Sequence, residues 1–168
     1  MPGYRRRTYS GYQYRKSSRP QPWRKNTNAS NGVLGNDGQQ TNVTLVANTN
    51  TSSNFSKVVT VSGIKVQMAC NYDLAGAGLP VYWCVQYCPN GIVASMTPTV
   101  GSQLIGPEQF ILASGVFLAT VFSPTLKISS RLMRKLSTND SIVLSIIPAD
   151  NPGTDPIEYA AMVEYFSK

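Results

Sequence analysis

Short runs in which apolar and polar residues alternate dominate the chain from Val43 onward. A repeat of two residues is the spacing of a β-strand with one buried face, and no segment has the length or end signals of a long amphipathic helix. Gly, Pro and Asn interrupt the runs every eight to fifteen residues. The pattern therefore predicts an all-β sandwich or barrel of about eight strands.

The runs of strand character can be placed along the chain. They cover residues 43–47, 57–71, 80–88, 108–122, 125–130, 141–147 and 158–166. The alternation in 57–71 changes phase at Gly63, which predicts either two strands that meet there or one strand with a bulge. Residues 108–122 are mostly apolar, as in strands covered on both faces.

One short segment departs from this pattern. In residues 131–136, Arg131, Arg134 and Lys135 follow i, i+3, i+4 spacing, which predicts a turn of helix with a basic face. The favoured interpretation of these three residues is an ordinary solvated face, and a second contact with a polyanion is the other.

The first 25 residues have a composition that cannot form a core. They hold eight Lys or Arg, no acid and no Leu, Ile, Val or Phe, whereas residues 26–168 hold seven cations and eight acids, a net charge of −1. We interpret residues 1–25 as a disordered, basic and aromatic arm. The polar, Asn- and Gly-rich residues 26–41 are predicted to be a flexible linker, and residues 42–168 the folded domain.

The arm combines phosphate-binding groups with stacking faces. Arginine binds phosphate as a planar fork, and Tyr and Trp stack on unpaired bases, so the arm suits single-stranded nucleic acid held mainly by counterion release. The predicted contacts are Arg5, Arg6, Arg7, Tyr9, Tyr12, Tyr14, Arg15, Lys16, Arg19, Trp23, Arg24 and Lys25. Arg5–Arg7 also suit a nuclear import signal, which is the alternative role of the arm.

Catalytic and cofactor-binding patterns are not found. The chain has no histidine, which excludes the usual nucleophilic triad, and it has no phosphate-binding loop, so we expect neither an enzyme nor a cofactor. Cys70, Cys84 and Cys88 lack zinc or disulfide spacing and are predicted to be reduced, buried thiols. Asp150 and Asp155 offer carboxylates to a calcium ion, but a turn-forming loop is the favoured interpretation. We expect no membrane span, no secretion signal and no transit peptide.

Several segments of the sequence resemble those of a known protein family. The arm MPGYRRRTYSGYQYRK, the runs KVVTVSGIKVQMACN and VYWCVQYCPNG, the basic segment ISSRLMRKLSTNDSIVLSI and the closing run EYAAMVEYF together resemble capsid proteins of small circular single-stranded DNA viruses that encode a replication-initiator protein, of circovirus or nanovirus type. The similarity is one of layout over the whole chain. It implies a single eight-stranded antiparallel jelly-roll sandwich behind the arm.

The same resemblance implies a function. About 60 copies would form a small T=1 icosahedral shell that packages single-stranded DNA through the arm. The chain would belong to the virion and, during assembly, to the host nucleus, with the nuclear import machinery and an unidentified host receptor as partners. Leu79, Ile92 and Val100 are expected at subunit contacts. The alternatives are a single-stranded nucleic-acid-binding β-barrel protein, the coat protein of a small RNA or satellite virus, and a lectin-like or adhesin module.

Overall fold

A computed structural model of the chain describes residues 22–34, 39–49, 58–72, 78–96, 110–120, 125–131, 133–149 and 157–168. Within these ranges the regular elements are all strands. They are β1 (Arg24–Val33), β2 (Thr41–Ala47), β3 (Val59–Asn71), β4 (Leu79–Cys88), β5 (Phe110–Ala119), β6 (Leu126–Ser130), β7 (Arg134–Leu136), β8 (Ser141–Pro148) and β9 (Glu158–Ser167).

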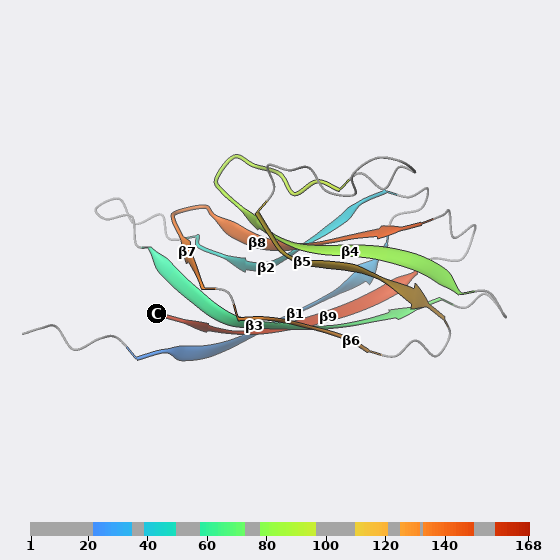
Figure 1. The fold of residues 1–168 in the computed structure, drawn as a ribbon, viewed down its shortest axis with the longest axis horizontal. Helices are drawn as coiled ribbons and strands as arrows, with labels where there is room; N and C mark the ends of the chain where they lie inside the picture. The colour runs from blue at the N-terminus through green and yellow to red at the C-terminus, as the bar shows by residue number, and fades with distance from the viewer. Residues whose placement is uncertain are drawn as a thin grey trace, which may run out of the picture.

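The strands form two antiparallel sheets that pack face to face (Figure 1). Sheet A has the order β1-β9-β3-β6, with β7 also paired to β3, and sheet B has the order β2-β8-β4-β5. Because β6 pairs with Ile64–Met68 and β7 with Val59–Val61, the two short strands together occupy one edge of β3. This strand order is that of a jelly roll. The predicted all-β jelly-roll sandwich is confirmed.

The hydrophobic core lies between the two sheets. From sheet A, Val66 and Met68 of β3 are at most 1% exposed, and from sheet B, Val81, Leu144 and Ile146 are fully buried. In β2 and β3 inward residues largely alternate with outward ones, as the two-residue period of the sequence predicts. Burial of each such aliphatic side chain contributes about 1.5–3 kcal/mol, so this layer is the main source of stability.

Gly63 produces the phase change within β3. Its φ is 62°, a left-handed conformation that favours glycine, and the pairing of β3 with β9 shifts register between Ser62 and Lys65. β3 is therefore one strand with a bulge, which confirms the second of the two alternatives. The bulge keeps Val61 and Ile64, three residues apart, both directed into the core.

We expect Gly63→Ala to lower the free energy of unfolding by about 1–2 kcal/mol. A side chain at this φ is strained, and a Cβ would lie 3.1 Å from Cδ2 of Phe166. Gly91→Ala is the matched control, because Gly91 has φ 83° but nothing within 4 Å of an added Cβ. Urea denaturation of both variants separates backbone strain from the contact. A Gly63→Ala variant as stable as the native chain would contradict this account of the bulge.

Strand β1 corrects the predicted domain boundaries. Residues 26–41 were expected to be a flexible linker, but Arg24–Val33 pair residue by residue with β9, and Thr41 already belongs to β2. The linker prediction is wrong for residues 26–33. Backbone pairing holds this segment at the edge of sheet A. It needs few apolar residues because most of its side chains stay exposed.

Two further expectations are corrected. The helical turn predicted for residues 131–136 is wrong, because Arg134–Leu136 form strand β7. The expectation that residues 108–122 are covered on both faces is wrong for β5, in which Val116 and Leu118 are each 53% exposed. The other predicted runs each contain a strand, and a turn follows β4 at Asn90–Gly91.

Candidate nucleic-acid interface

Charged residues are divided unequally between the two sheets. The strands of sheet A carry six cations and two acids, whereas the strands of sheet B carry no charged side chain. The cations are Arg24, Lys25, Lys65, Lys127, Arg134 and Lys135, and the acids are Glu158 and Glu164. Sheet A is therefore the side of the described fold that can attract a polyanion.

Cross-strand pairing brings separate cations together on the outward face of sheet A, the face turned away from sheet B. Lys65 of β3 lies opposite Ser129 of β6, and Gln67 lies opposite Lys127. Lys65 and Lys127 are therefore diagonal neighbours, roughly 7–8 Å apart, and both are exposed. Neither lysine was among the contacts predicted from the sequence. Each lysine occupies a polar position of an alternating run, which is the feature of the sequence that predicts an outward side chain.

The predicted arm residues divide into two groups. Arg5, Arg6, Arg7, Tyr9, Tyr12, Tyr14, Arg15, Lys16 and Arg19 lie outside the described residues. Trp23, Arg24 and Lys25 are described, and the last two begin β1.

Two contacts hold the beginning of β1 against the end of the chain. The Nζ of Lys168 lies 4.6 Å from the centre of the Trp23 ring, a cation–π geometry, and the Nζ of Lys25 lies 3.1 Å from Oε1 of Glu164. Lys168 also exchanges backbone hydrogen bonds with Thr60. The point where residues 1–21 join the fold is therefore fixed to sheet A.

The candidate second contact is only partly exposed. Arg131 and Lys135 are exposed, and Lys135 lies opposite Thr60 on the outward face of sheet A. Arg134 instead is half-buried, with its guanidinium 6.0 Å from the centre of the Tyr87 ring and its Nε buried without a hydrogen-bond partner. The strand conformation separates these side chains because residues 134 and 135 point to opposite faces. Arg131 and Lys135 thus stay candidates for the second contact, and Arg134 packs inside the fold.

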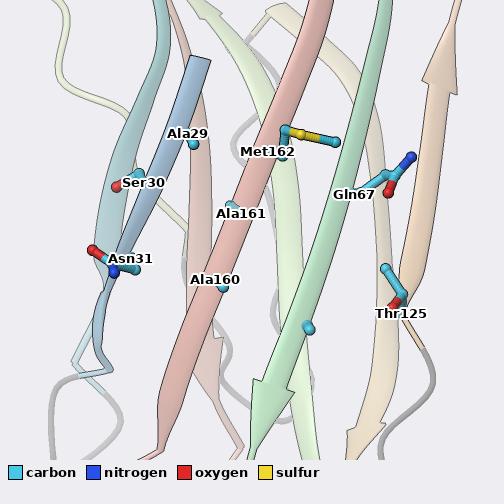
Figure 2. A pocket seen from close by; sticks show the side chains of 9 residues that line it. Ala29, Ser30, Asn31, Gln67, Thr125, Ala160, Ala161 and Met162 are labelled. Carbon is cyan, nitrogen blue, oxygen red and sulfur yellow. The ribbon is translucent and has the colours of Figure 1, made fainter. Parts of the chain in front are cut away.

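A shallow hollow of about 400 Å³ lies on the same outward face (Figure 2). Small side chains of three adjacent strands, Ala29, Ala69 and Ala160, leave the space open, and Met162, Gln67 and Thr125 stand around it. Figure 2 shows side chains of β1, β9 and β3 around the hollow, with Thr125, the residue before β6, beside them. The hollow thus offers an apolar floor with amide and hydroxyl groups at its edge.

Asp140 links its own turn, between β7 and β8, to the end of β4 and the turn that follows β4. Its side chain is 4% exposed and accepts hydrogen bonds from Tyr87 Oη (2.7 Å), Ser137 N (2.7 Å) and Asn90 N (3.0 Å). Burial alone would raise the pKa of this carboxyl, but these donors hold its pKa below the ordinary value. Burial and the hydrogen bond to Asp140 raise the pKa of Tyr87 to about 12. We interpret these hydrogen bonds as a structural cluster that holds the turn containing Asp140 against the end of β4.

Part of the outward face of sheet B is covered by the chain that follows β4. Gln40 Nε2 donates to the carbonyl oxygen of Ala94 (2.7 Å), and Met96 N donates to Gln40 Oε1 (2.8 Å). Cys84 packs below Met96, and Cys88 packs below Ala94. The three cysteines are free and buried, as predicted, and burial raises the pKa of Cys84 to about 12, so its thiol stays protonated near neutral pH.

Exposed apolar side chains lie elsewhere on sheet B and its loops. Val116 and Leu118 of β5 are each 53% exposed, and Ile92 and Val93 are 59% and 77% exposed. Of the residues predicted at subunit contacts, Ile92 is exposed, Val100 lies outside the described residues, and Leu79 is buried in the core. The four exposed groups lie on β5 and on the chain that follows β4, and exposed apolar side chains also occur on sheet A, at Val33, Met162 and Phe166.

In the described ranges no group of three His, Cys, Asp or Glu side chains is arranged to hold a metal ion. The loop that contains Asp150 and Asp155 lies outside these ranges. None of the described residues belongs to a helix long and apolar enough to span a membrane.

No protein-family model matches the sequence, and no curated protein matches it. Among solved structures, the fold is similar to a chain from Desmodium yellow mottle tymovirus, with 10% identity, a TM-score of 0.40, and coverage of 94% of this chain and 95% of that chain. It is also similar to a chain from infectious bursal disease virus, Gx strain, with 9% identity and a TM-score of 0.40. The second match covers 86% of this chain and 32% of that chain.

Proposed function

We propose that this chain is a viral capsid subunit that assembles into a closed shell and packages single-stranded nucleic acid through its basic arm. The shell is of the small T=1 type, with about 60 copies, and the genome is single-stranded DNA. Arg5–Arg7 serve both in packaging and as the signal for import into the host nucleus, where assembly takes place.

The observation that carries this proposal is the unequal division of charge between the two sheets. Cations gather on sheet A, to which the arm is joined, whereas the strands of sheet B are uncharged and β5 exposes Val116 and Leu118. A shell subunit needs one surface for the genome and others for neighbouring copies. The jelly roll is compatible with this role but also occurs in lectins and cupins, so the surface carries the argument and the fold does not.

A second candidate is a single-stranded nucleic-acid-binding protein that does not form a shell. The exposed lysines of sheet A favour it, because such proteins place cations on a sheet surface. The exposed apolar groups Ile92, Val93, Val116 and Leu118 favour the shell, because a protein that binds only nucleic acid gains nothing from them.

The mass of the purified full-length protein separates the two candidates. Size-exclusion chromatography with light scattering, with absorbance read at two wavelengths to count nucleotides, should give a particle with about 1.1 MDa of protein, from about 60 copies of the 18.3 kDa chain, together with nucleic acid. Digestion of the extracted nucleic acid by a deoxyribonuclease but not by a ribonuclease would identify DNA. A monomer or small oligomer on short nucleic acid, under all assembly conditions tested, would support the second candidate instead.

A further inference from the structure

We propose that the outward face of sheet A is a second binding surface for the same single-stranded nucleic acid, with phosphates at Lys65 and Lys127 and an unpaired base in the alanine-floored hollow beside them. This inference rests on the proposed function and names a binding site in the folded domain, apart from the arm.

The two lysines are available to an external anion. Among the described residues the ion pair formed is Lys25 with Glu164, at 3.1 Å. Lys65 lies opposite Glu164 in the register of β3 with β9, but that carboxylate already binds Lys25. As diagonal neighbours, Lys65 and Lys127 form a compact pair of cations at an exposed position, which suits the closely spaced phosphates of one strand.

The hollow supplies the groups that an unstacked base needs. Ala69 and Ala160 face each other across β3 and β9, so a flat ring can approach the sheet closely there. The thioether of Met162 offers an apolar contact, and the amide of Gln67 offers both a donor and an acceptor to a base edge. Gln67, at the edge of the hollow, is also the register partner of Lys127. The proposed base site therefore lies next to the proposed phosphate contact at Lys127.

The placement of the arm favours nucleic acid as the occupant of this face. The described chain begins beside β1 on sheet A, with Trp23 held against Lys168, so nucleic acid bound by residues 1–21 is delivered to this side of the subunit. Sheet B has no charged side chain in its strands and cannot compete for phosphates. Charge complementarity and the attachment of the arm thus indicate the same face.

The first test uses full-length protein and a short oligothymidylate, with affinity measured by fluorescence anisotropy as salt is raised. We expect Lys65→Gln with Lys127→Gln to reduce the slope of log K against log salt by about 1.4, because each single-strand phosphate contact contributes about 0.7. An unchanged slope would overturn the inference. If the variant with Arg5–Arg7 changed to Gln weakens binding but the Lys65 and Lys127 variant does not, the proposed function stands and the outward face of sheet A is not a binding surface. If neither variant weakens binding, the proposed function fails as well.

A matched pair of substitutions tests the hollow. Ala160→Glu places a carboxylate in the hollow, and Thr44→Glu places one at an exposed position of β2 in sheet B. Both variants change the net charge equally, so we expect weaker binding for Ala160→Glu and near-native binding for Thr44→Glu. Equal effects would overturn the inference. So would an Ala160→Glu variant that changes particle mass but not affinity, because the face would then contact a second copy.

Photo-crosslinking gives a direct readout. Oligothymidylate that contains 4-thiothymidine is irradiated with the native protein, and the linked peptides are identified by mass spectrometry. We expect links in the segments that carry Gln67 and Met162 in addition to links in the arm. Links confined to the arm, or found equally on the strands of sheet B, would contradict the proposal.

Discussion

Asp140→Ala lowers the free energy of unfolding by about 3–5 kcal/mol, the largest stability loss that we expect from one substitution outside the apolar core. The carboxylate is buried and accepts three hydrogen bonds, from Ser137 in its own turn and from Tyr87 and Asn90 at the end of β4. Its removal leaves those donors, whose hydrogen bonds to Asp140 are part-buried, without their acceptor. Each buried donor left unsatisfied costs about 1–3 kcal/mol, so the sum is several times that of a surface change.

Two further variants show whether the loss comes from the carboxylate. Tyr87→Phe removes one donor together with its hydroxyl and should cost about 1 kcal/mol, because the other two bonds to Asp140 persist. Asp140→Asn keeps the shape but replaces one acceptor oxygen with an NH₂ group, while the other oxygen, like Oδ2 of Asp140, can still accept two bonds. Its loss of stability should therefore lie between those of Tyr87→Phe and Asp140→Ala. Urea denaturation of unassembled subunits measures all three. An Asp140→Ala variant within 1 kcal/mol of the native chain would contradict this role.

The same cluster makes stability depend on acid. The hydrogen bonds hold the pKa of Asp140 below its ordinary value of 3.8, so the folded state binds the proton more weakly than the unfolded state does. This contribution is complete above the ordinary pKa and is lost as the pH falls through the folded-state pKa. The native chain should therefore lose more stability than Asp140→Asn as the pH falls below about 4. Parallel curves for the two proteins would exclude Asp140 as the cause.

The strands that alternation predicted are those with one face in the core. β2, β3, β6 and β9 have buried positions two residues apart, so the period was visible in the sequence. β4 and β8 are buried on both faces over most of their length and were predicted from their apolar and aromatic composition. β1 was missed for the opposite reason. Its sequence RKNTNASNGV holds no regular apolar period, and it is a strand because β9 supplies a complete set of backbone partners. Backbone pairing between distant segments leaves no local pattern in an exposed edge strand such as β1.

The candidate interface shows the same limit. The arm was identified because its charges are consecutive, but Lys65 and Lys127 each stand alone in an alternating run. Only the register of β3 with β6 makes them neighbours. Arg134 and Lys135 are adjacent in sequence and separate in space, because a strand sends successive side chains to opposite faces. The grouping of charges on a sheet therefore depends on strand pairing, which composition does not specify.

The largest functional effect is expected in the arm. Replacing the six cations Arg5, Arg6, Arg7, Arg15, Lys16 and Arg19 with glutamine should lower the affinity for single-stranded DNA at low salt by about a thousandfold and reduce the salt slope by about 4, at about 0.7 for each phosphate released from its counterion. The circular dichroism of the folded domain should not change, because all six lie before β1. Particles formed by this variant should contain little nucleic acid.

An arm with the same residues in scrambled order is the control that tests the mechanism. Counterion release depends on the number of cations and not on their order, so the scrambled arm should keep the native salt slope and most of the affinity. Loss of binding on scrambling would mean that the order of Arg5–Arg7 and the tyrosines forms a specific site. Changing Tyr9, Tyr12 and Tyr14 to alanine removes stacking but no charge, so it should weaken binding without changing the slope. Slope and affinity together thus separate the two roles of the arm, phosphate neutralisation and base stacking.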